Sequence, residues 1–318
     1  MQTYSKKVTD KRYGMAALIQ HNGLIHTHAI GVAGDSLVMT PDKVFNIASL
    51  TKTFTAVLIL QEIEKGTLKL NDTIGKWFTA NKNVATGITI EQLLRQTSGL
   101  EEVVEVMYAE KVFLDAGNDY NHVFLYDKIG APIAKPGEGY KYRNTNYIML
   151  GYILEALNQK PYNTIIKERI FDVCNMKNSY AYYSKNISNA AHPMMGKDLL
   201  SAVNDTYYKN YSFSAACIAS NLFDLSSFFN LLYTTNSLIS RKSFSNMATF
   251  NDSDYGMGLQ RYPYKNTYFY GHGGDNISFK IRNYYNPVTN DLLIIASNRF
   301  GDPYMDKLTK DVLEVYGF

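Results

Sequence analysis

The sequence predicts an α+β protein in which both ends of the chain build one antiparallel sheet and a mainly helical region is inserted between them. Segments typical of strands, separated by turn signals, occur over residues 14–29 and again over residues 255–297. Helical patterns fill most of the chain between these two regions. We therefore expect a single unit of 318 residues, with an α/β subdomain at about 1–45 and 216–318 and a helical subdomain at about 46–215.

The expected strands are bounded by clear turn signals. At the N-terminus, residues 14–20 and 24–29 flank Asn22-Gly23, the strongest short-range signal for a β-hairpin. Four further strands are expected near the C-terminus, at residues 255–260, 267–270, 278–284 and 292–297. Residues 286–291, with the sequence Asn-Pro-Val-Thr-Asn-Asp, predict the turn between the last two strands.

Six helices are expected, at residues 49–65, 88–99, 142–155, 162–171, 220–233 and 303–316. The first is apolar almost all round, which predicts a buried helix, and Gly66 is its expected stop. The second begins with a Thr89 N-cap signal and is expected to end at Gly99. The last has Asp302 as its expected N-cap and Pro303 at its first helical position.

Composition argues against several classes of function. A formal net charge of +3, without long runs of like charge, does not favour a nucleic-acid partner. The longest aliphatic run is about five residues, far too short for a membrane span. Residues 1–7 carry no apolar segment after their lysines, so no signal peptide is expected there. The two cysteines, Cys174 and Cys217, form no disulfide framework, and six scattered histidines give no metal-binding pattern.

Residues 45–56 carry the strongest chemical signal, because they contain Ser49-x-x-Lys52. Residues three apart at the start of a helix share one face. A serine hydroxyl becomes a nucleophile when a base takes its proton, and a lysine whose pKa is lowered by its surroundings can be that base. The free N–H groups of a first helical turn would also favour negative charge near Ser49. Taken alone, the motif is more often a serine N-cap followed by a surface lysine.

Two further motifs place polar groups at expected boundaries. Tyr142-x-Asn144 follows the Pro/Gly loop at residues 136–139 and begins an expected helix. A tyrosine can shuttle a proton and an asparagine can donate to a substrate carbonyl, although most such pairs are helix caps. The second motif, His-Gly-Gly at residues 272–274, enters an expected strand. Glycines at a strand edge let a ligand backbone approach and pair with it, although a glycine-flanked histidine is usually a turn.

In their order and spacing, these motifs resemble those of the penicillin-binding-protein-like serine hydrolases. The most similar branch contains the class C β-lactamases, D-alanyl-D-alanine carboxypeptidases and esterases. The resemblance extends from Gly14 to about Asn298 and includes the segments 45–56, 97–100, 142–151, 255–258 and 271–274. It implies a β-lactamase/transpeptidase-like fold, with the antiparallel sheet flanked by helices.

The resemblance also implies a role for each motif. Ser49 would be the nucleophile that forms an acyl-enzyme, and Lys52 would hydrogen-bond Ser49 and act as, or assist, the base in acylation. Tyr142 is the second candidate base and would give a proton to the leaving group. The sequence does not decide between Lys52 and Tyr142 as the base. Asn144 would bind the substrate amide.

The strand edge at His272, Gly273 and Gly274 would bind substrate, and the backbone N–H groups of Ser49 and Asp275 would form the oxyanion hole. His272 stands where many members of the family carry lysine, which weakens the case for a substrate carboxylate and for true β-lactamase activity. Three other positions depart from the family pattern. Gln96 stands where many relatives have histidine, and Arg143 stands where they have a small residue; Arg143 would either supply the missing carboxylate contact or point away from the cleft. Ile277-Ser278-Phe279 stands where relatives often have Pro-Gly-Phe, which would alter the rim of the cleft.

These observations predict a serine hydrolase that acts through a Ser49 acyl-enzyme on D-amino-acid peptides or small esters, with weak or no β-lactamase activity. Its substrate would be a small molecule or short peptide, and the chemistry needs no cofactor or metal. An acyltransferase that uses the same acyl-enzyme is a variant, which would depend on the loops at residues 101–141 and 177–214. The proteins that the sequence resembles are mostly exported to the periplasm or cell envelope. The sequence itself leaves open export or a cytoplasmic location, and it leaves open the oligomeric state.

Two other classes compete with this interpretation. A catalytically idle binding or assembly module predicts the loss of Ser49, Lys52, Tyr142 or the Gly-Gly edge, and all of these are present. An α/β-hydrolase requires a G-x-S-x-G nucleophile elbow, which the sequence lacks.

Overall fold

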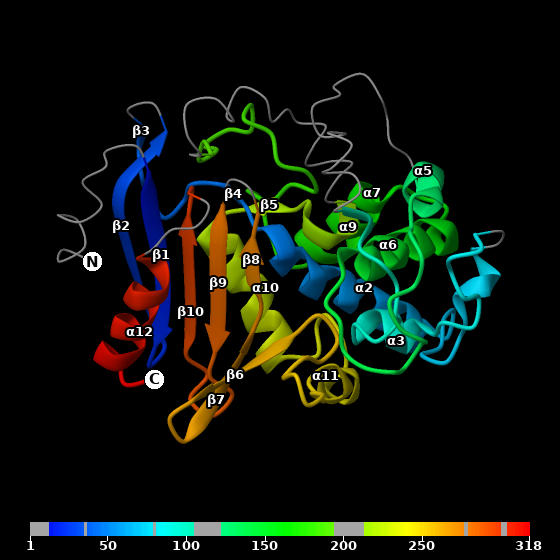
Figure 1. Ribbon diagram of the computed structural model, residues 1–318. Coiled ribbons are helices and arrows are strands. Elements are labelled where there is room, and N and C mark those ends of the chain that lie inside the picture. Colours follow the sequence, from blue (N-terminus) through cyan, green and yellow to red (C-terminus); the bar gives the residue numbers. More distant parts are fainter. Residues whose placement is uncertain are drawn as a thin grey trace.

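A computed structural model of the chain describes residues 13–34, 37–78, 81–104, 122–193, 213–276, 279–299 and 304–318. Within these residues lies an eight-stranded antiparallel sheet in the order β3-β2-β1-β10-β9-β7-β6, with β8 paired to β9. Its strands are β1 (Gly14–His21), β2 (Leu24–Gly34), β3 (Leu37–Val38), β6 (Gln260–Tyr264), β7 (Thr267–Gly271), β8 (Gly273–Asp275), β9 (Lys280–Tyr285) and β10 (Leu292–Ser297). Both ends of the chain therefore build the sheet, as predicted (Figure 1).

Helices occupy much of the described chain between the two groups of strands (Figure 1). The short strands β4 (Phe45–Asn46) and β5 (Ala219–Ser220) pair where the chain enters and leaves this region. The helical elements are the 3₁₀ turns η1 (Ala48–Leu50) and η2 (Ile74–Lys76), α2 (Thr51–Lys65), α3 (Ile90–Leu94), α5 (His122–Asp127), α6 (Asn144–Asn158), α7 (Tyr162–Ile166), the π-helical turn η4 (Lys167–Phe171), α9 (Phe213–Ala216), α10 (Leu222–Thr234), α11 (Arg241–Met247) and α12 (Met305–Val315).

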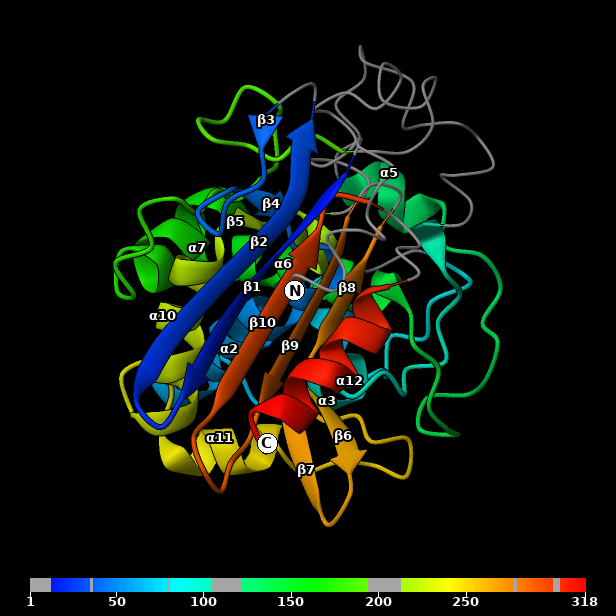
Figure 2. The same cartoon turned by 90° about the vertical axis from the view of Figure 1, so that its left-hand side faces the viewer.

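Different helices cover the two faces of the sheet. Figure 2 shows α12 in front of the strands, with α2, α6 and α10 behind them. Met15 and Ala17 of β1 pack in one apolar cluster with Leu308 of α12. Ala16 and Leu18 belong to the larger cluster on the opposite face, which includes residues of α2 and α10. Successive side chains of a strand point to opposite faces, so β1 is buried on both sides and apolar along most of its length.

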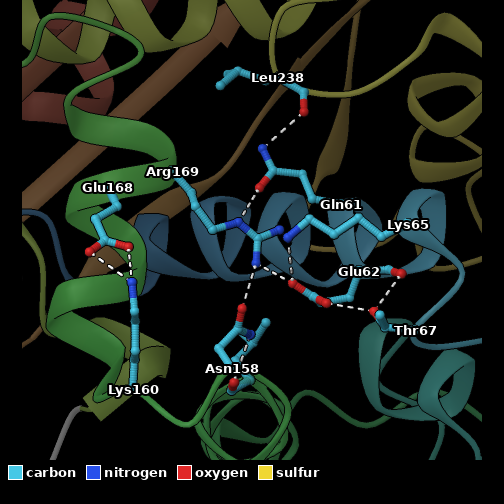
Figure 3. A network of polar contacts seen from close by, with 10 residues as sticks. Gln61, Glu62, Lys65, Thr67, Asn158, Lys160, Glu168, Arg169 and Leu238 are labelled. Atoms are coloured by element: carbon cyan, nitrogen blue, oxygen red, sulfur yellow. Dashed lines mark hydrogen bonds and ion pairs between the residues drawn. The ribbon is translucent and has the colours of Figure 1, made fainter.

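The predicted buried helix is α2, and a polar network fixes its C-terminal end (Figure 3). The helix stops at Gly66, which adopts a φ of +78°, as predicted. The Glu62 carboxylate, 3% exposed, accepts hydrogen bonds from Thr67 Oγ1 at 2.6 Å and Lys65 Nζ at 3.2 Å. It also pairs with the Arg169 guanidinium of η4. This network anchors the far end of the helix that carries Lys52.

The expected helix at residues 88–99 is shorter than predicted. Thr89 caps it with a full capping box, as expected, but α3 ends at Leu94. The chain leaves the helix at Gln96, which takes the left-handed φ of +62°. The N–H groups of Gln96 and Thr97 donate to carbonyls of the last helical turn, at 3.2 and 2.8 Å, in the pattern of a Schellman cap. A glutamine therefore takes the position that Gly99 was expected to hold.

The prediction of a strand at residues 255–260 is wrong. Tyr255 and Gln260 form only an isolated bridge, because the chain turns tightly between them, with the Gly256 N–H donating to the Leu259 carbonyl at 2.8 Å. Gly258, with a φ of +66°, lies against the backbone of α2. The strand that follows is β6.

Two other expected boundaries change. The residues at 273–275 form a strand of their own, β8, rather than the entry to β9. The helix expected from residue 142 begins at Asn144.

Several expectations fall outside the described residues. These are the cap at Asp302 and Pro303, residues 277 and 278, the N-terminal residues 1–7 and large parts of the loops at 101–141 and 177–214. The division into an α/β subdomain and a helical subdomain stays a prediction. Among the described residues, no helix has the length and apolar character needed to cross a bilayer.

Candidate active site

Ser49 and Lys52 lie together at the junction of η1 and α2. Ser49 is in the 3₁₀ turn rather than in the first turn of the α-helix, which corrects the expected placement. The preceding Ala48 takes a φ of +47°, an unusual conformation for a non-glycine residue, and its N–H donates to Asn46 Oδ1 at 2.9 Å. Lys52 is fully buried, and its Nζ lies 3.0 Å from Ser49 Oγ. The commoner arrangement, a serine cap with a surface lysine, is thus absent here.

The Lys52 amine makes two further contacts inside the protein. Nζ donates to Asn144 Oδ1 at 2.7 Å and to the Ala215 carbonyl at 3.0 Å. Burial lowers the pKa of Lys52 to about 7, against a partial opposing effect of the Glu102 carboxylate. An amine with this pKa is substantially neutral near neutral pH, whereas a solvated lysine is fully protonated.

Tyr142 lies just before α6, with its ring against the same amine. Lys52 Nζ is 4.8 Å from the centre of the Tyr142 ring. The buried Tyr142 hydroxyl makes no hydrogen bond of ordinary geometry with a described residue. Burial raises the pKa of Tyr142 well above its usual value and the neighbouring Tyr255 raises it further, while an interaction with the Ser49 hydroxyl lowers it in part. The phenol is therefore held in its protonated form.

Asn144 is the first residue of α6, and its side chain joins Lys52 to a carboxylate that sequence reasoning missed. Asn144 Nδ2 lies 3.3 Å from Glu102 Oε2, and the Asn144 backbone N–H donates to the same oxygen at 2.7 Å. Glu102 is 6% exposed. The only signal in the sequence is its position directly after the Thr-Ser-Gly-Leu-Glu segment, and nothing there indicates that it approaches Asn144.

His272 is buried beside the rings of Tyr142 and Tyr255. Its Nδ1 lies 2.5 Å from the Gly273 carbonyl, which can only accept, so Nδ1 carries the proton. Nε2 is then the acceptor for the Tyr255 hydroxyl at 3.3 Å. Burial lowers the pKa of His272 to about 3, and the charge of Lys52 acts in the same direction. His272 is therefore neutral at physiological pH and provides no fixed positive charge.

The strand β8 packs directly against the turn that carries Ser49. A Cβ atom on Gly274 would lie 2.2 Å from the Ile47 carbonyl oxygen, so only glycine permits this approach. Gly273 faces the other side of the strand, where a Cβ atom would lie 3.2 Å from Arg282 Nη1. Arg282 pairs with Asp275 at 2.7 Å. The structure thus brings both expected oxyanion-hole residues, Ser49 and Asp275, onto adjoining elements.

Gln96 and Arg143, which depart from the family pattern, bind groups of the protein near the start of α6. Gln96 Oε1 accepts from the Arg143 backbone N–H at 2.9 Å and from Asn146 Nδ2. Arg143 Nη1 donates to the Tyr142 carbonyl at 3.1 Å, and its Nε lies 3.9 Å from Glu101.

Within the described ranges, no group of three or more His, Cys, Asp or Glu side chains is placed to hold a metal ion.

In a comparison with known protein families, residues 2–316 of this chain match the family described as Beta-lactamase. The chain belongs to the beta-lactamase family. A solved structure shares the fold: the D-amino acid amidase from Ochrobactrum anthropi SV3 superposes with a TM-score of 0.84 at 22% identity, covering 99% of both chains. The predicted fold class is therefore confirmed.

Two bacterial relatives match parts of the chain. Protein flp of Staphylococcus aureus (strain NCTC 8325 / PS 47) is 35% identical over 131 residues, which are 40% of this chain and 26% of flp. Penicillin-binding protein 4* of Bacillus subtilis (strain 168) is 27% identical over 188 residues, which are 57% of this chain and 41% of that protein. The match thus spans less than half of either relative.

Proposed function

We propose that this member of the beta-lactamase family is a serine hydrolase that forms an acyl-enzyme on Ser49 and acts on D-amino-acid peptides or amides and on small esters. The observation that carries the proposal is the buried Lys52 amine, 3.0 Å from Ser49 Oγ and lowered in pKa to about 7. A base must lie within hydrogen-bond reach of the proton that it takes, and its pKa should be near the working pH. Lys52 meets both conditions.

Acylation would follow from these positions. The neutral Lys52 amine takes the proton of Ser49 as Oγ forms a bond to the substrate carbonyl carbon. The negative charge that develops on the carbonyl oxygen would be met by the backbone N–H groups of Ser49 and Asp275, which is the predicted oxyanion hole. The leaving group then departs, and water hydrolyses the ester formed on Ser49 Oγ, which restores the free enzyme.

Tyr142 suits the role of proton donor rather than that of base. A tyrosinate base requires a lowered pKa, whereas burial raises the pKa of this phenol. A protonated phenol beside Ser49 would give its proton to the departing amine or alkoxide and regain one from Lys52, whose Nζ lies over the ring. These electrostatics favour Lys52 as the acylation base, a choice that the sequence left open.

The substrate class is inferred from charge and from the fold neighbours. A neutral, buried His272 supports no strong binding of a substrate carboxylate, which fits weak or absent β-lactamase activity. Among the solved structures of this fold are a D-amino acid amidase from Ochrobactrum anthropi SV3 and a D-stereospecific amidohydrolase from Streptomyces sp.. Amides and esters of D-amino acids are therefore the substrates we propose first.

The proposal is tested by intact-protein mass and by release of product after incubation with p-nitrophenyl acetate, with D-phenylalanine amide and with a penicillin. We expect turnover or an acyl adduct with the ester and the amide, little or no penicillin adduct, and none of these in Ser49→Ala. Turnover by Ser49→Ala would overturn the assignment of the nucleophile. Inertness of the wild type toward all three reagents would favour the idle binding module.

A further inference from the structure

Glu102 is a buried carboxylate whose two oxygens are both held by neighbouring N–H groups. Oε2 accepts from the Asn144 backbone at 2.7 Å and lies 3.3 Å from Asn144 Nδ2, and Oε1 accepts from the Val104 backbone at 3.1 Å. Asn144 opens α6, and the residue before it, Arg143, makes no side-chain cap. Glu102 therefore also supplies the acceptor that this helix start lacks.

This carboxylate decides which way the Asn144 amide points. An ionised carboxylate accepts only, so the NH₂ end of the amide must face Glu102. Oδ1 then faces Lys52 Nζ, 2.7 Å away. The flipped amide would place an oxygen against the Glu102 carboxylate and two N–H donors against the Lys52 amine, and both contacts would be repulsive. Removal of Glu102 would leave the orientation without this constraint.

We propose that Glu102 is a positioning residue, which fixes the Asn144 amide so that its Oδ1 holds the Lys52 amine against Ser49. The inference rests on the proposed function, because it concerns the base of that reaction. It also assigns Asn144 a part in aligning the base, beside its predicted contact with the substrate amide. The chain of contacts runs from Glu102 through Asn144 and Lys52 to Ser49.

The Glu102 carboxylate acts on the same amine. Burial raises the pKa of Glu102, while the backbone N–H donors of Asn144 and Val104 and the charge of Lys52 act in the opposite direction. The Glu102 charge raises the pKa of Lys52 against the larger lowering by burial. The other groups that face the amine are the Ala215 carbonyl, the rings of Tyr142 and Tyr147, at 4.8 and 5.9 Å, and the buried His272, whose pKa the lysine charge lowers. Each of these others is uncharged at neutral pH, so Glu102 is the charged partner of Lys52 among the described residues.

Two substitutions separate charge from position. Glu102→Gln removes the charge and keeps the length of the side chain. The acid limb of its kcat/KM profile with p-nitrophenyl acetate should move down by roughly one pH unit, because Lys52 loses its anionic partner. Glu102→Asp keeps the charge but is too short for both contacts with Asn144, so kcat should fall roughly tenfold or more while the acid limb stays within a few tenths of a unit and KM changes little. Glu138→Gln, on an exposed loop carboxylate, is the matched control and should change neither quantity.

The outcomes distinguish this inference from the proposed function. If wild-type protein shows no Ser49-dependent turnover, the proposed function fails. If the wild type is active and Glu102→Asp keeps the wild-type kcat, the positioning role of Glu102 is wrong. A wild-type acid limb in Glu102→Gln would overturn the effect of the Glu102 charge on Lys52. Thermal melting shows whether each variant folds. If Glu102→Asp does not fold, Glu102→Ala takes its place, and a wild-type kcat in Glu102→Ala would overturn the positioning role.

Discussion

Gly274 offers a sharp test of how closely β8 must approach the nucleophile. The Cβ atom of Gly274→Ala would lie 2.2 Å from the Ile47 carbonyl oxygen and 2.8 Å from Ile281 Cγ2. The first of these atoms belongs to the backbone beside η1, which carries Ser49, and cannot turn aside as a flexible side chain does. An ordinary contact needs about 3.4 Å, so β8 and η1 must separate by about 1 Å.

This displacement acts on the oxyanion hole that we propose. The N–H groups of Ser49 and Asp275 lie on the two elements that separate, so they can no longer both reach the same oxygen. A misplacement of about 1 Å costs roughly 10²-fold in rate, and loss of one donor costs about 10²- to 10³-fold in kcat. We therefore expect Gly274→Ala to lower kcat for p-nitrophenyl acetate by roughly two orders of magnitude.

Gly273→Ala is the matched control on the same strand. Its Cβ atom would lie 3.2 Å from Arg282 Nη1, the mobile end of a long side chain, so a small shift of that side chain relieves the contact. We expect its kcat within a few-fold of the wild type, and melting temperatures within a few degrees for both folded variants. A wild-type kcat for Gly274→Ala, or equal losses in the two variants, would show that the contact between β8 and η1 does not set the rate.

Three further predictions concern the base, the proton donor and the anchor of α2. For the wild type, kcat/KM should rise with pH through about 7, because only the neutral Lys52 amine accepts a proton; a profile flat between about pH 5 and 9 would contradict this. Tyr142→Phe should slow the hydrolysis of D-phenylalanine amide, whose leaving group needs a proton, by about 10²-fold or more, measured by release of ammonia. A rate within a few-fold of the wild type would remove Tyr142 from the mechanism. Arg169→Met leaves the Glu62 carboxylate, 3% exposed, without its main cation and should lower the free energy of unfolding by about 3 kcal/mol. Lys160→Met breaks a half-exposed ion pair, so it should lower the free energy of unfolding by less than about 1 kcal/mol. Urea titration measures both variants, and an equal loss of free energy in the two would contradict the role of burial.

The parts of the fold that the sequence predicted are those encoded by local patterns. The β1–β2 hairpin follows from Asn22-Gly23, the end of α2 from Gly66, and the start of α3 from Thr89. The Ser49–Lys52 contact agrees with their spacing, since residues three apart at the start of a helix share one face.

The parts that the sequence did not predict depend on contacts between distant segments. Gln96 takes a left-handed conformation where glycine was expected, and its side chain is bound by the start of α6, some fifty residues away in the chain. Glu102 meets Asn144 across 42 positions and Tyr255 meets His272 across 17, neither at a spacing with a local rule. Propensity cannot place such pairs, because the tertiary packing brings them together.

The distribution of charge around Ser49 narrows the substrates that the site can favour. Arg282 and Arg143, which lie near β8 and Tyr142, are both directed away from Ser49. Gly273 faces Arg282 and Gly274 faces η1, so Arg282 lies on the side of β8 away from Ser49, paired with Asp275. Arg143 contacts the Tyr142 carbonyl and approaches Glu101. Lys52, beside Ser49, is held by internal contacts and must lose its proton to act. A carboxylate beside the scissile bond would therefore find no fixed positive partner among these groups, and we expect neutral amides and esters to react faster than the corresponding free acids.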